Sequence, residues 1–364
     1  MTTTPAPSDA APTGTTAAGS GIAFDSGIAE TDPDIAGTAT RLEQQGYGGL
    51  HIAELTRDPF INAALALTAA HQATVATQVA VAFARNPMTV ALSTRHLQDL
   101  SGGRFVLGLG TQVAAHVTKR FSMPWSKPAA RMEEFIRALR AIWQTWDTGD
   151  RLAFRGEFYT HTLMTPAFSP PPAAAGNSPI HLAAVGPLMC RTAGRVADGV
   201  VVHAFCTPKY LAEVITPAVQ GGRAEAEADG IADSRPPFQM VAPVFVVTGA
   251  TAEQRESARS KVSQQIAFYG STPAYRDVLA GHGWGELADQ LHALSVSRDP
   301  GKWTAMGELI TDDVLAEFAV VTDDPADVPA QVVRRYRGLV DRVVVGRPEG
   351  VSVEDWSAAI RAVG

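Results

Sequence analysis

The 364-residue sequence predicts an α/β fold, a (β/α)8 or TIM barrel with insertions. Short apolar runs of strand length alternate with longer amphipathic runs, which is the rhythm of a parallel sheet or barrel. A Gly-x-Gly-x-x-Gly turn does not follow the first run, and this disfavours a doubly wound open sheet, the alternative fold. Eight strand-like runs are present, at 22–24, 49–53, 75–83, 104–108, 180–184, 199–202, 239–247 and either 318–321 or 341–345.

Helical patterns fill the segments between these runs. The clearest is 128–146, where apolar residues recur at helical spacing on one face. Two segments interrupt the rhythm as insertions: a β-hairpin at 152–159, followed by a Pro-rich loop at 166–179, and a set of short helices at 270–310. The remaining helices are predicted at 33–45, 59–71, 88–100, 187–196, 208–219 and 251–268.

Composition narrows the class of protein. The net charge of −7 argues against nucleic acid as a partner, because no basic stripe is present. No apolar run reaches the length of a membrane span, and two cysteines do not make a disulfide framework. Residues 1–20 lack Lys and Arg, so we expect a disordered tail rather than a secretory leader, with 21–364 forming one domain in a cytoplasmic protein. No metal site is expected, because no His, Cys, Asp or Glu residues have ligand spacing.

The segment from Ser101 to Gln112 holds the most informative strand. Two glycines turn the chain, a short buried strand follows, and Gly108 and Gly110 let the backbone approach another group closely. In an α/β protein, ligands bind where such strands end. We therefore expect Gly110 and Thr111 to border a ligand.

A second candidate site is Gly186-Pro187, which opens a helix directly after a strand. The free N–H groups and the helix dipole make such a turn able to bind phosphate. An ordinary βα turn with a good start signal has the same residues, so the sequence leaves both readings open.

Several segments together resemble the bacterial luciferase-like superfamily of flavin and deazaflavin enzymes. They are Leu100-Ser-Gly-Gly-Arg-Phe-Val-Leu-Gly-Leu-Gly110, Ala183-Ala-Val-Gly-Pro187, Ala193-Gly-Arg-Val-Ala-Asp-Gly199 and Gly46-Tyr-Gly-Gly-Leu-His-Ile-Ala-Glu54. The runs 56–60, 79–87, 110–113 and 267–275 look more like its coenzyme F420-dependent oxidoreductase branch.

The resemblance implies a TIM barrel that holds a hydride-transferring tricyclic cofactor. It implies that the cofactor phosphate lies at Ala183, Ala184, Val185, Gly186 and Pro187. It also implies a cis peptide bond between Gln78 and Val79 behind the cofactor ring. Coenzyme F420 is the expected cofactor, and FMN is the alternative.

Two residues are candidate catalysts. Glu54 ends a strand, where barrels place catalytic groups, although an ion pair with Arg57 or Arg85 would account for it equally well. His116 follows the fourth strand and has a side chain suited to proton delivery near neutral pH; a surface position on a helix is the alternative. This chain has Leu55 where many relatives have His, which argues against a mechanism that needs a His at that point. It has Val113 where sugar-phosphate-oxidising relatives have Glu, so we do not expect sugar-phosphate oxidation.

Four further residues are expected to line the substrate pocket: Arg120, Trp125, Tyr269 and Tyr275. Aromatic residues also commonly fill protein cores, which is the competing interpretation. The function expected is hydride transfer between F420 and a small or medium organic substrate. A reduced-FMN monooxygenase and a non-catalytic flavin- or deazaflavin-binding protein are the alternatives, and a homodimer is expected from the resemblance.

Overall fold

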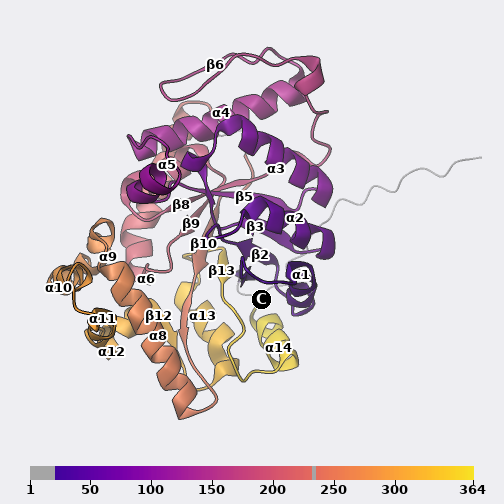
Figure 1. Cartoon of the computed structure of the whole chain (residues 1–364). Coiled ribbons are helices and arrows are strands. Elements are labelled where there is room, and N and C mark those ends of the chain that lie inside the picture. The colour runs from indigo at the N-terminus through magenta and orange to yellow at the C-terminus, as the bar shows by residue number, and fades with distance from the viewer. Residues whose placement is uncertain (1–20, 232–234) are drawn as a thin grey trace, which may run out of the picture.

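Eight parallel strand positions form a closed barrel in the computed structural model, which describes residues 21–231 and 235–364 (Figure 1). The barrel closes because β3 pairs with both β2 and β5, while β13 pairs with both β1 and β10. The predicted TIM barrel is confirmed, and closure excludes the open sheet. In barrel order the strands are β1 (Ala23–Ile28), β2 (Gly49–Ile52), β3 (Thr74–Thr77) with β4 (Ala80–Val81), β5 (Phe105–Gly110), β8 (Ile180–Ala184), β9 (Gly199–Val202), β10 (Gln239–Pro243) and β13 (Arg342–Val344).

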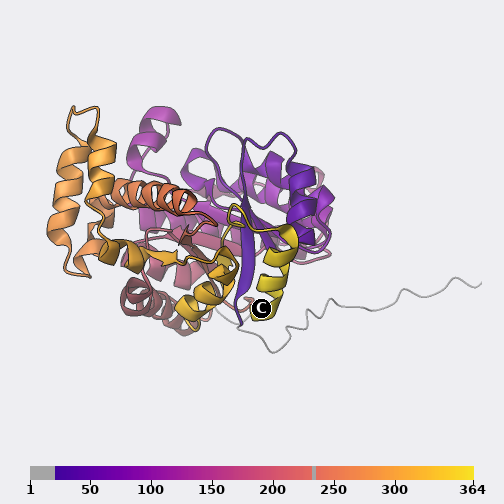
Figure 2. The same cartoon turned by 90° about the horizontal axis from the view of Figure 1, so that it is seen from below.

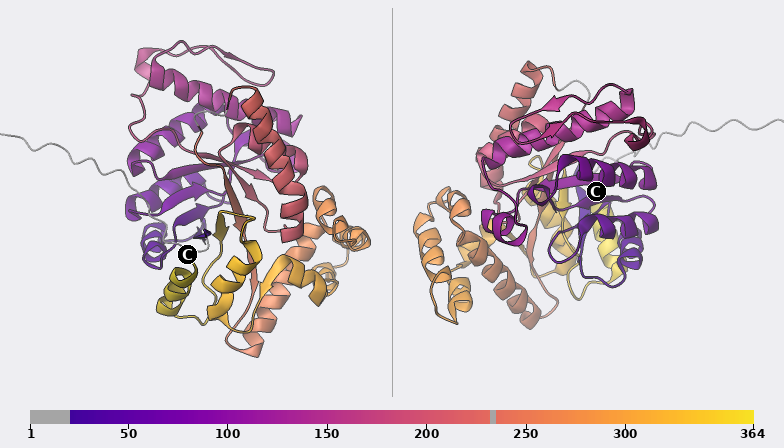
Figure 3. Two further views of the ribbon diagram at one scale, coloured as in Figure 1. Left: turned by 180° about the vertical axis from the view of Figure 1, so that it is seen from behind. Right: turned by 45° about the horizontal axis from the view of Figure 1, so that its top comes forward.

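Helices cover the outside of the barrel (Figures 1 and 3). Their starts follow from capping residues: Asp34, Asp58 and Asn86 each accept a hydrogen bond from the first turn of the next helix. The covering helices are α1 (Ile35–Gln44), α2 (Pro59–Ala69), α3 (Pro87–Ser101), α4 (Pro128–Thr148), α5 (Pro187–Val196), α6 (Pro208–Tyr210) with α7 (Thr216–Ala228), α13 (Val328–Tyr336) and α14 (Val353–Val363).

Two predicted strands need correction, and one open choice is decided. The run 75–83 is not one strand, because β3 ends at Thr77 and the chain bulges before β4 and a 3-10 turn at Ala82–Ala84. The run 239–247 divides into β10 and β11 (Phe245–Val247). Of the two candidates for the eighth strand, β13 completes the barrel, whereas β12 (Ala319–Val321) pairs with β11 in a separate two-stranded sheet.

The insertions lie on different sides of the barrel. The hairpin consists of β6 (Phe154–Arg155) and β7 (Thr160–His161), close to α4. A helical insertion projects from one side, as Figure 2 shows in orange. It contains α8 (Ala252–Gly270), the 3-10 turn η5 (Pro273–Tyr275), α9 (Arg276–Ala280), α10 (Gly285–Ser295), α11 (Lys302–Glu308) and α12 (Asp312–Phe318).

A buried ion cluster ties three barrel strands together near their amino ends. Arg342 donates from Nε and Nη2 to the two carboxylate oxygens of Asp25, at 2.7 and 2.6 Å, and His51 Nε2 lies 2.9 Å from Asp25 Oδ2. Burial alone would raise the pKa of Asp25, but the charges and hydrogen bonds of Arg342 and His51 outweigh it and lower the pKa. Asp25 is therefore held as a carboxylate beneath the barrel mouth.

Two expectations concern other parts of the chain. The predicted disordered tail, 1–20, lies outside the described residues. No helix within 21–231 or 235–364 has the length and apolar character needed to cross a membrane.

Candidate active site

The mouth of the barrel, at the carboxyl ends of its strands, is lined by small residues. Inward positions alternate along β1, so that Gly27 and Ala29 follow Asp25 on the same side, and both are exposed to solvent. Ala53 after β2 and Ala183 in β8 are partly exposed. A flat ring system can therefore approach the strand backbones here.

Gly108 and Gly110 lie in close contact with the neighbouring chain at the β3–β4 bulge. A Cβ at Gly108 would lie 1.8 Å from the Thr77 carbonyl oxygen, and one at Gly110 would lie 2.5 Å from Val79 Cγ2. The bulge between β3 and β4 therefore requires glycine at both positions, and the bordering of a ligand by Gly110 stays a prediction. The peptide bond in this bulge, Gln78–Val79, is cis, at the position that the resemblance implies.

The amino end of α5 is open to a ligand. Gly186 is its N-cap and Pro187 its first residue, and no side chain caps the helix. The next residue, Leu188, is 68% exposed. The N–H groups of this first turn are therefore available to an anion, at the carboxyl end of β8.

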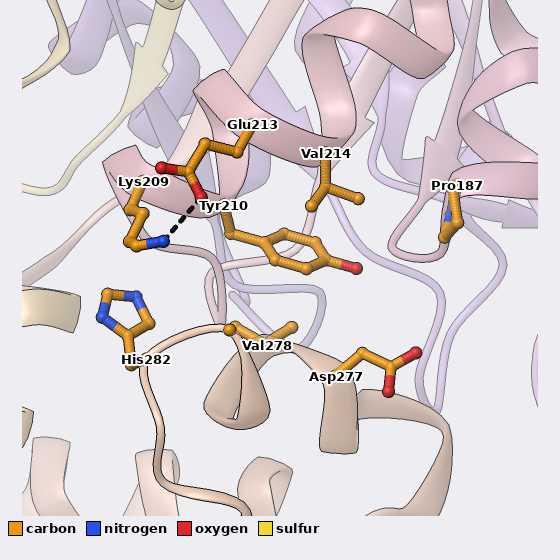
Figure 4. Close-up of a pocket in the computed structure, with 9 residues that line it drawn as sticks. Pro187, Lys209, Tyr210, Glu213, Val214, Asp277, Val278 and His282 are labelled. Carbon is orange, nitrogen blue, oxygen red and sulfur yellow. Dashed lines mark hydrogen bonds and ion pairs between the residues drawn. The ribbon is translucent and has the colours of Figure 1, made fainter.

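A cavity of about 190 Å³ adjoins this helix start (Figure 4). Lys209 and Glu213 form an ion pair with a 2.5 Å Nζ–Oε2 distance. Asp277 has no ion-pair partner in the described chain, and in Figure 4 its carboxylate lies on the side of the cavity toward Pro187. The other lining residues are Tyr210, Val214, Val278, Gly281 and His282.

Glu54 is held by its neighbours. Its Oε2 accepts from the Val81 N–H and from Arg85 Nη1, both at 2.7 Å, and Arg85 also pairs with Asp58 at 2.9 Å. Of the two partners considered from sequence, Arg85 is the one found. The Glu54 carboxylate thereby links the end of β2 to β4, and its other oxygen makes no hydrogen bond within the described chain.

His116 lies in an exposed turn. It begins η2 (His116–Arg120), a single π-helical turn after β5, and its side chain is exposed, as its alternative interpretation expected. Arg120, at the other end of the turn, donates to the Leu55 carbonyl oxygen at 2.5 Å. Thr111 donates to the Gln112 carbonyl oxygen at 2.9 Å. This loop is therefore fastened to the end of β2 by Arg120.

The predicted pocket aromatics fall into two places. Tyr269 and Tyr275 meet at His203, with ring centroids 4.4 and 5.1 Å from the imidazole. Trp125 instead packs edge-on against the ring of Phe83, with ring centroids 5.7 Å apart. The tertiary structure thus brings Tyr269 and Tyr275, two of the four predicted pocket residues, together at His203.

Sequence reasoning missed two acidic residues of β1 and its loop. Asp25 follows the apolar pair Ala23-Phe24 inside a strand, and this was the signal available for a buried charge. Glu30, just after β1, accepts from the Thr56 hydroxyl at 3.1 Å. A carboxylate at the carboxyl end of a barrel strand is in the position of a functional group.

The model of the luciferase-like monooxygenase family matches residues 11–342. The chain belongs to this family. An uncharacterised protein of Mycobacterium tuberculosis is 47% identical over 310 residues, covering 85% of this chain and 88% of that protein. A 5,10-methylenetetrahydromethanopterin reductase of Archaeoglobus fulgidus is 29% identical over 284 residues, covering 77% of each.

A solved structure shares the fold. The coenzyme F420-dependent tetrahydromethanopterin reductase from Methanopyrus kandleri superposes with a TM-score of 0.71 at 21% identity, covering 94% of this chain and 98% of that one. Members of the matching family are monooxygenases by its description, and the two named reductases are oxidoreductases.

The residues present fit a flat, phosphate-bearing cofactor of this kind. The barrel mouth carries small side chains, and the amino end of α5 is uncapped. Gln78 Nε2, beside the bulge, is buried without a hydrogen-bond partner in the described chain. A buried donor without a partner is costly, so a ligand acceptor at this point would stabilise the site.

Proposed function

We propose that this protein is an F420-dependent oxidoreductase acting on a small or medium organic substrate. The observation that carries the proposal is the uncapped amino end of α5, at the carboxyl end of β8 and beside the small-residue barrel mouth. The reductase relatives named above support deazaflavin as the cofactor. When bound, F420 would supply or accept a hydride.

The chain's own residues have three tasks in this proposal. The first turn of α5, with Gly186 and Pro187, binds the cofactor phosphate through backbone N–H groups. Ala183, Ala184, Val185, Gly110 and Thr111 border the cofactor, with Gln78 and Val79 behind its ring. Because the side chains at the barrel mouth are small, a bound ring can lie close against the strands and exclude water. Exclusion of water strengthens the remaining polar contacts.

Proton handling is assigned to groups at the ends of β2 and β5. Glu54 is already oriented by Arg85 and the Val81 N–H, so it holds a fixed position without substrate. The exposed imidazole of His116, in the loop after β5, is assigned the delivery of a proton to the site. Trp125 and Arg120 are proposed to lie at the substrate's edge.

Reduced FMN is the alternative cofactor, with a monooxygenase reaction, and the description of the matching family favours it. Titration with oxidised F420 and with FMN, followed by fluorescence quenching, separates the two. Tight binding of FMN without binding of F420 would overturn the proposal.

The phosphate site has its own test at Gly186. A side chain there meets no atom within 4 Å, so Gly186→Asp and Gly186→Asn are both tolerated and both cap α5. We expect the aspartate to weaken F420 binding by about tenfold or more, since it places a negative charge where the phosphate binds. The neutral Gly186→Asn is the matched control and should weaken binding less. Wild-type affinity in both variants would place the phosphate elsewhere.

We also propose a homodimer in the cytoplasm. Exposed apolar side chains gather on the adjacent helices α2 and α3, namely Ile61, Leu65, Leu92 and Leu100. Such a patch is typical of a subunit interface. Both cysteines are unpaired, which suits a reducing compartment. Light scattering of the purified protein tests the dimer, and a monomer at micromolar concentration would refute it.

A further inference from the structure

Three aromatic side chains with unused polar atoms meet where β9 ends. His203 follows β9, Tyr269 lies in the last turn of α8, and Tyr275 ends η5. The imidazole is edge-on to the Tyr269 ring at 4.4 Å and tilted toward the Tyr275 ring at 5.1 Å. We call these residues the His203 cluster. It joins the barrel to the helical insertion.

The hydrogen bonding of His203 defines its tautomer. The Phe205 N–H donates to His203 Nδ1 at 3.0 Å, so Nδ1 is an acceptor and the ring proton is on Nε2. Burial lowers the pKa of His203 to about 4, and the ring is therefore neutral at physiological pH. His203 Nε2 is then a hydrogen-bond donor that has no acceptor within the described chain.

The two phenols are also unused. Neither the Tyr269 nor the Tyr275 hydroxyl makes a hydrogen bond within the described residues. Burial raises the pKa of Tyr269, and burial together with the nearby Tyr269 raises the pKa of Tyr275, so both hydroxyls keep their protons. The cluster thus offers three neutral donors with no protein acceptor.

The direction of His203 follows from the strand alternation. A Cβ at Gly199 would lie 2.6 Å from the His181 ring, which places this face of β9 inside the barrel. Val201 and His203 follow at two-residue intervals on the same face. His203 therefore stands at the barrel mouth, where the cofactor is proposed to bind.

The surroundings of the cluster are apolar. Phe268 packs against Tyr269 at 5.4 Å and against Trp303 at 5.7 Å, and both outer rings are about half exposed. No lysine or arginine of the described chain pairs with the three rings of the cluster. Neutral donors beside an apolar wall suit an uncharged oxygen on an apolar body, whereas a phosphate or carboxylate would require a cation.

We propose that the His203 cluster binds the substrate's oxygen and that the substrate is an apolar ketone or the matching secondary alcohol. This inference rests on the proposed function for its hydride. In the reducing direction the cofactor, when bound, would supply a hydride to the carbonyl carbon, and the C=O π electrons would move to the oxygen. A tyrosine hydroxyl donates its proton to the alkoxide oxygen, which gives the alcohol. The tyrosinate then takes a proton from water. A phenol is a stronger acid than the alcohol formed, so the transfer is favourable.

The test follows the carbonyl directly. Acetophenone labelled with ¹³C at the carbonyl is added to the full-length protein with and without oxidised F420, which cannot give up a hydride. Donation to the oxygen moves the carbonyl resonance downfield, and we expect this shift with the wild-type protein. Tyr269→Phe and Tyr275→Phe should each weaken acetophenone binding by about 3–10-fold, the effect of one hydrogen bond, and the double variant should reduce the shift to the part that His203 Nε2 alone can cause.

Controls separate this inference from folding and from cofactor choice. Tyr159→Phe removes a phenol hydroxyl on the hairpin side of α4, where it accepts from Arg131, and should leave the carbonyl shift unchanged. F420 titration should give wild-type affinity in both tyrosine variants. A shift that is absent with wild type, or that keeps its full size in the double variant, overturns the inference. A tyrosine-dependent shift in a protein that does not bind F420 would support the oxygen site while refuting the proposed cofactor.

Discussion

Gly108 is the position where one added methyl group should disturb the barrel most. In Gly108→Ala the new Cβ would lie 1.8 Å from the Thr77 carbonyl oxygen, well inside van der Waals contact, and that oxygen belongs to the backbone. β3 and β5 must therefore move apart. Separation breaks two buried hydrogen bonds, from Thr77 Oγ1 to the Gly108 carbonyl at 2.7 Å and from the Gly108 N–H to Thr77 Oγ1 at 2.9 Å.

The magnitude follows from these contacts. Each hydrogen bond contributes about 1 kcal/mol, and overpacking of a filled site costs about 1–3 kcal/mol. We expect the free energy of unfolding to fall by about 3–5 kcal/mol. In urea denaturation followed by circular dichroism, the midpoint should fall by about 1–2 M.

Gly221→Ala is the matched control. Gly221 lies inside α7, and a Cβ there meets no atom within 4 Å. Because glycine is a poor helix former, this variant should gain about 0.5–1 kcal/mol. A Gly108→Ala midpoint equal to that of wild type would refute the reasoning about close strand approach.

Three further predictions concern charge. Arg342→Met leaves the wholly buried Asp25 carboxylate without its cation, so we expect a loss of about 3–5 kcal/mol in urea denaturation, and a second change, Asp25→Asn, should recover part of it. Asp277→Asn removes a negative charge beside the start of α5 and should tighten F420 binding about two- to fivefold, an effect that must shrink with salt if it is electrostatic. Burial lowers the pKa of His181 to about 3, so the folded protein binds fewer protons than the unfolded chain below pH 6.5. Stability should then fall as the pH drops from 6.5 toward 3, and His181→Gln should make this slope shallower by about 1.4 kcal/mol per pH unit, whereas an unchanged slope would contradict the assignment.

Local patterns in the sequence were sufficient for the fold class and for most elements. The α5 range was predicted at its observed bounds, since a strand, Gly186 and Pro187 give an unambiguous helix start. Alternation of apolar and amphipathic runs identified the barrel without any pairing information. The same patterns failed at the β3–β4 bulge, because a bulge depends on the neighbouring strand rather than on its own residues.

Tertiary structure decided the choices that depend on distant partners. Residues 318–321 and 341–345 look alike as isolated runs, and only pairing with β1 and β10 selects β13 for the barrel. Arg342 reaches Asp25 across 317 positions of the chain. No local pattern encodes such a contact, because its energy arises only when both groups are buried together.

The candidate site also has features that local sequence predicts and features that only tertiary contacts decide. The sequence by itself predicted candidate ligand sites at the ends of the strands and at Gly186-Pro187, because those positions follow from local chain geometry. Only the tertiary structure showed that Arg85 holds Glu54, that Val79 fills the space beside Gly110, and that Tyr269 and Tyr275 meet His203. The physical reason is that the chemistry of a side chain is set by its partners, and these lie on other strands and in the helical insertion.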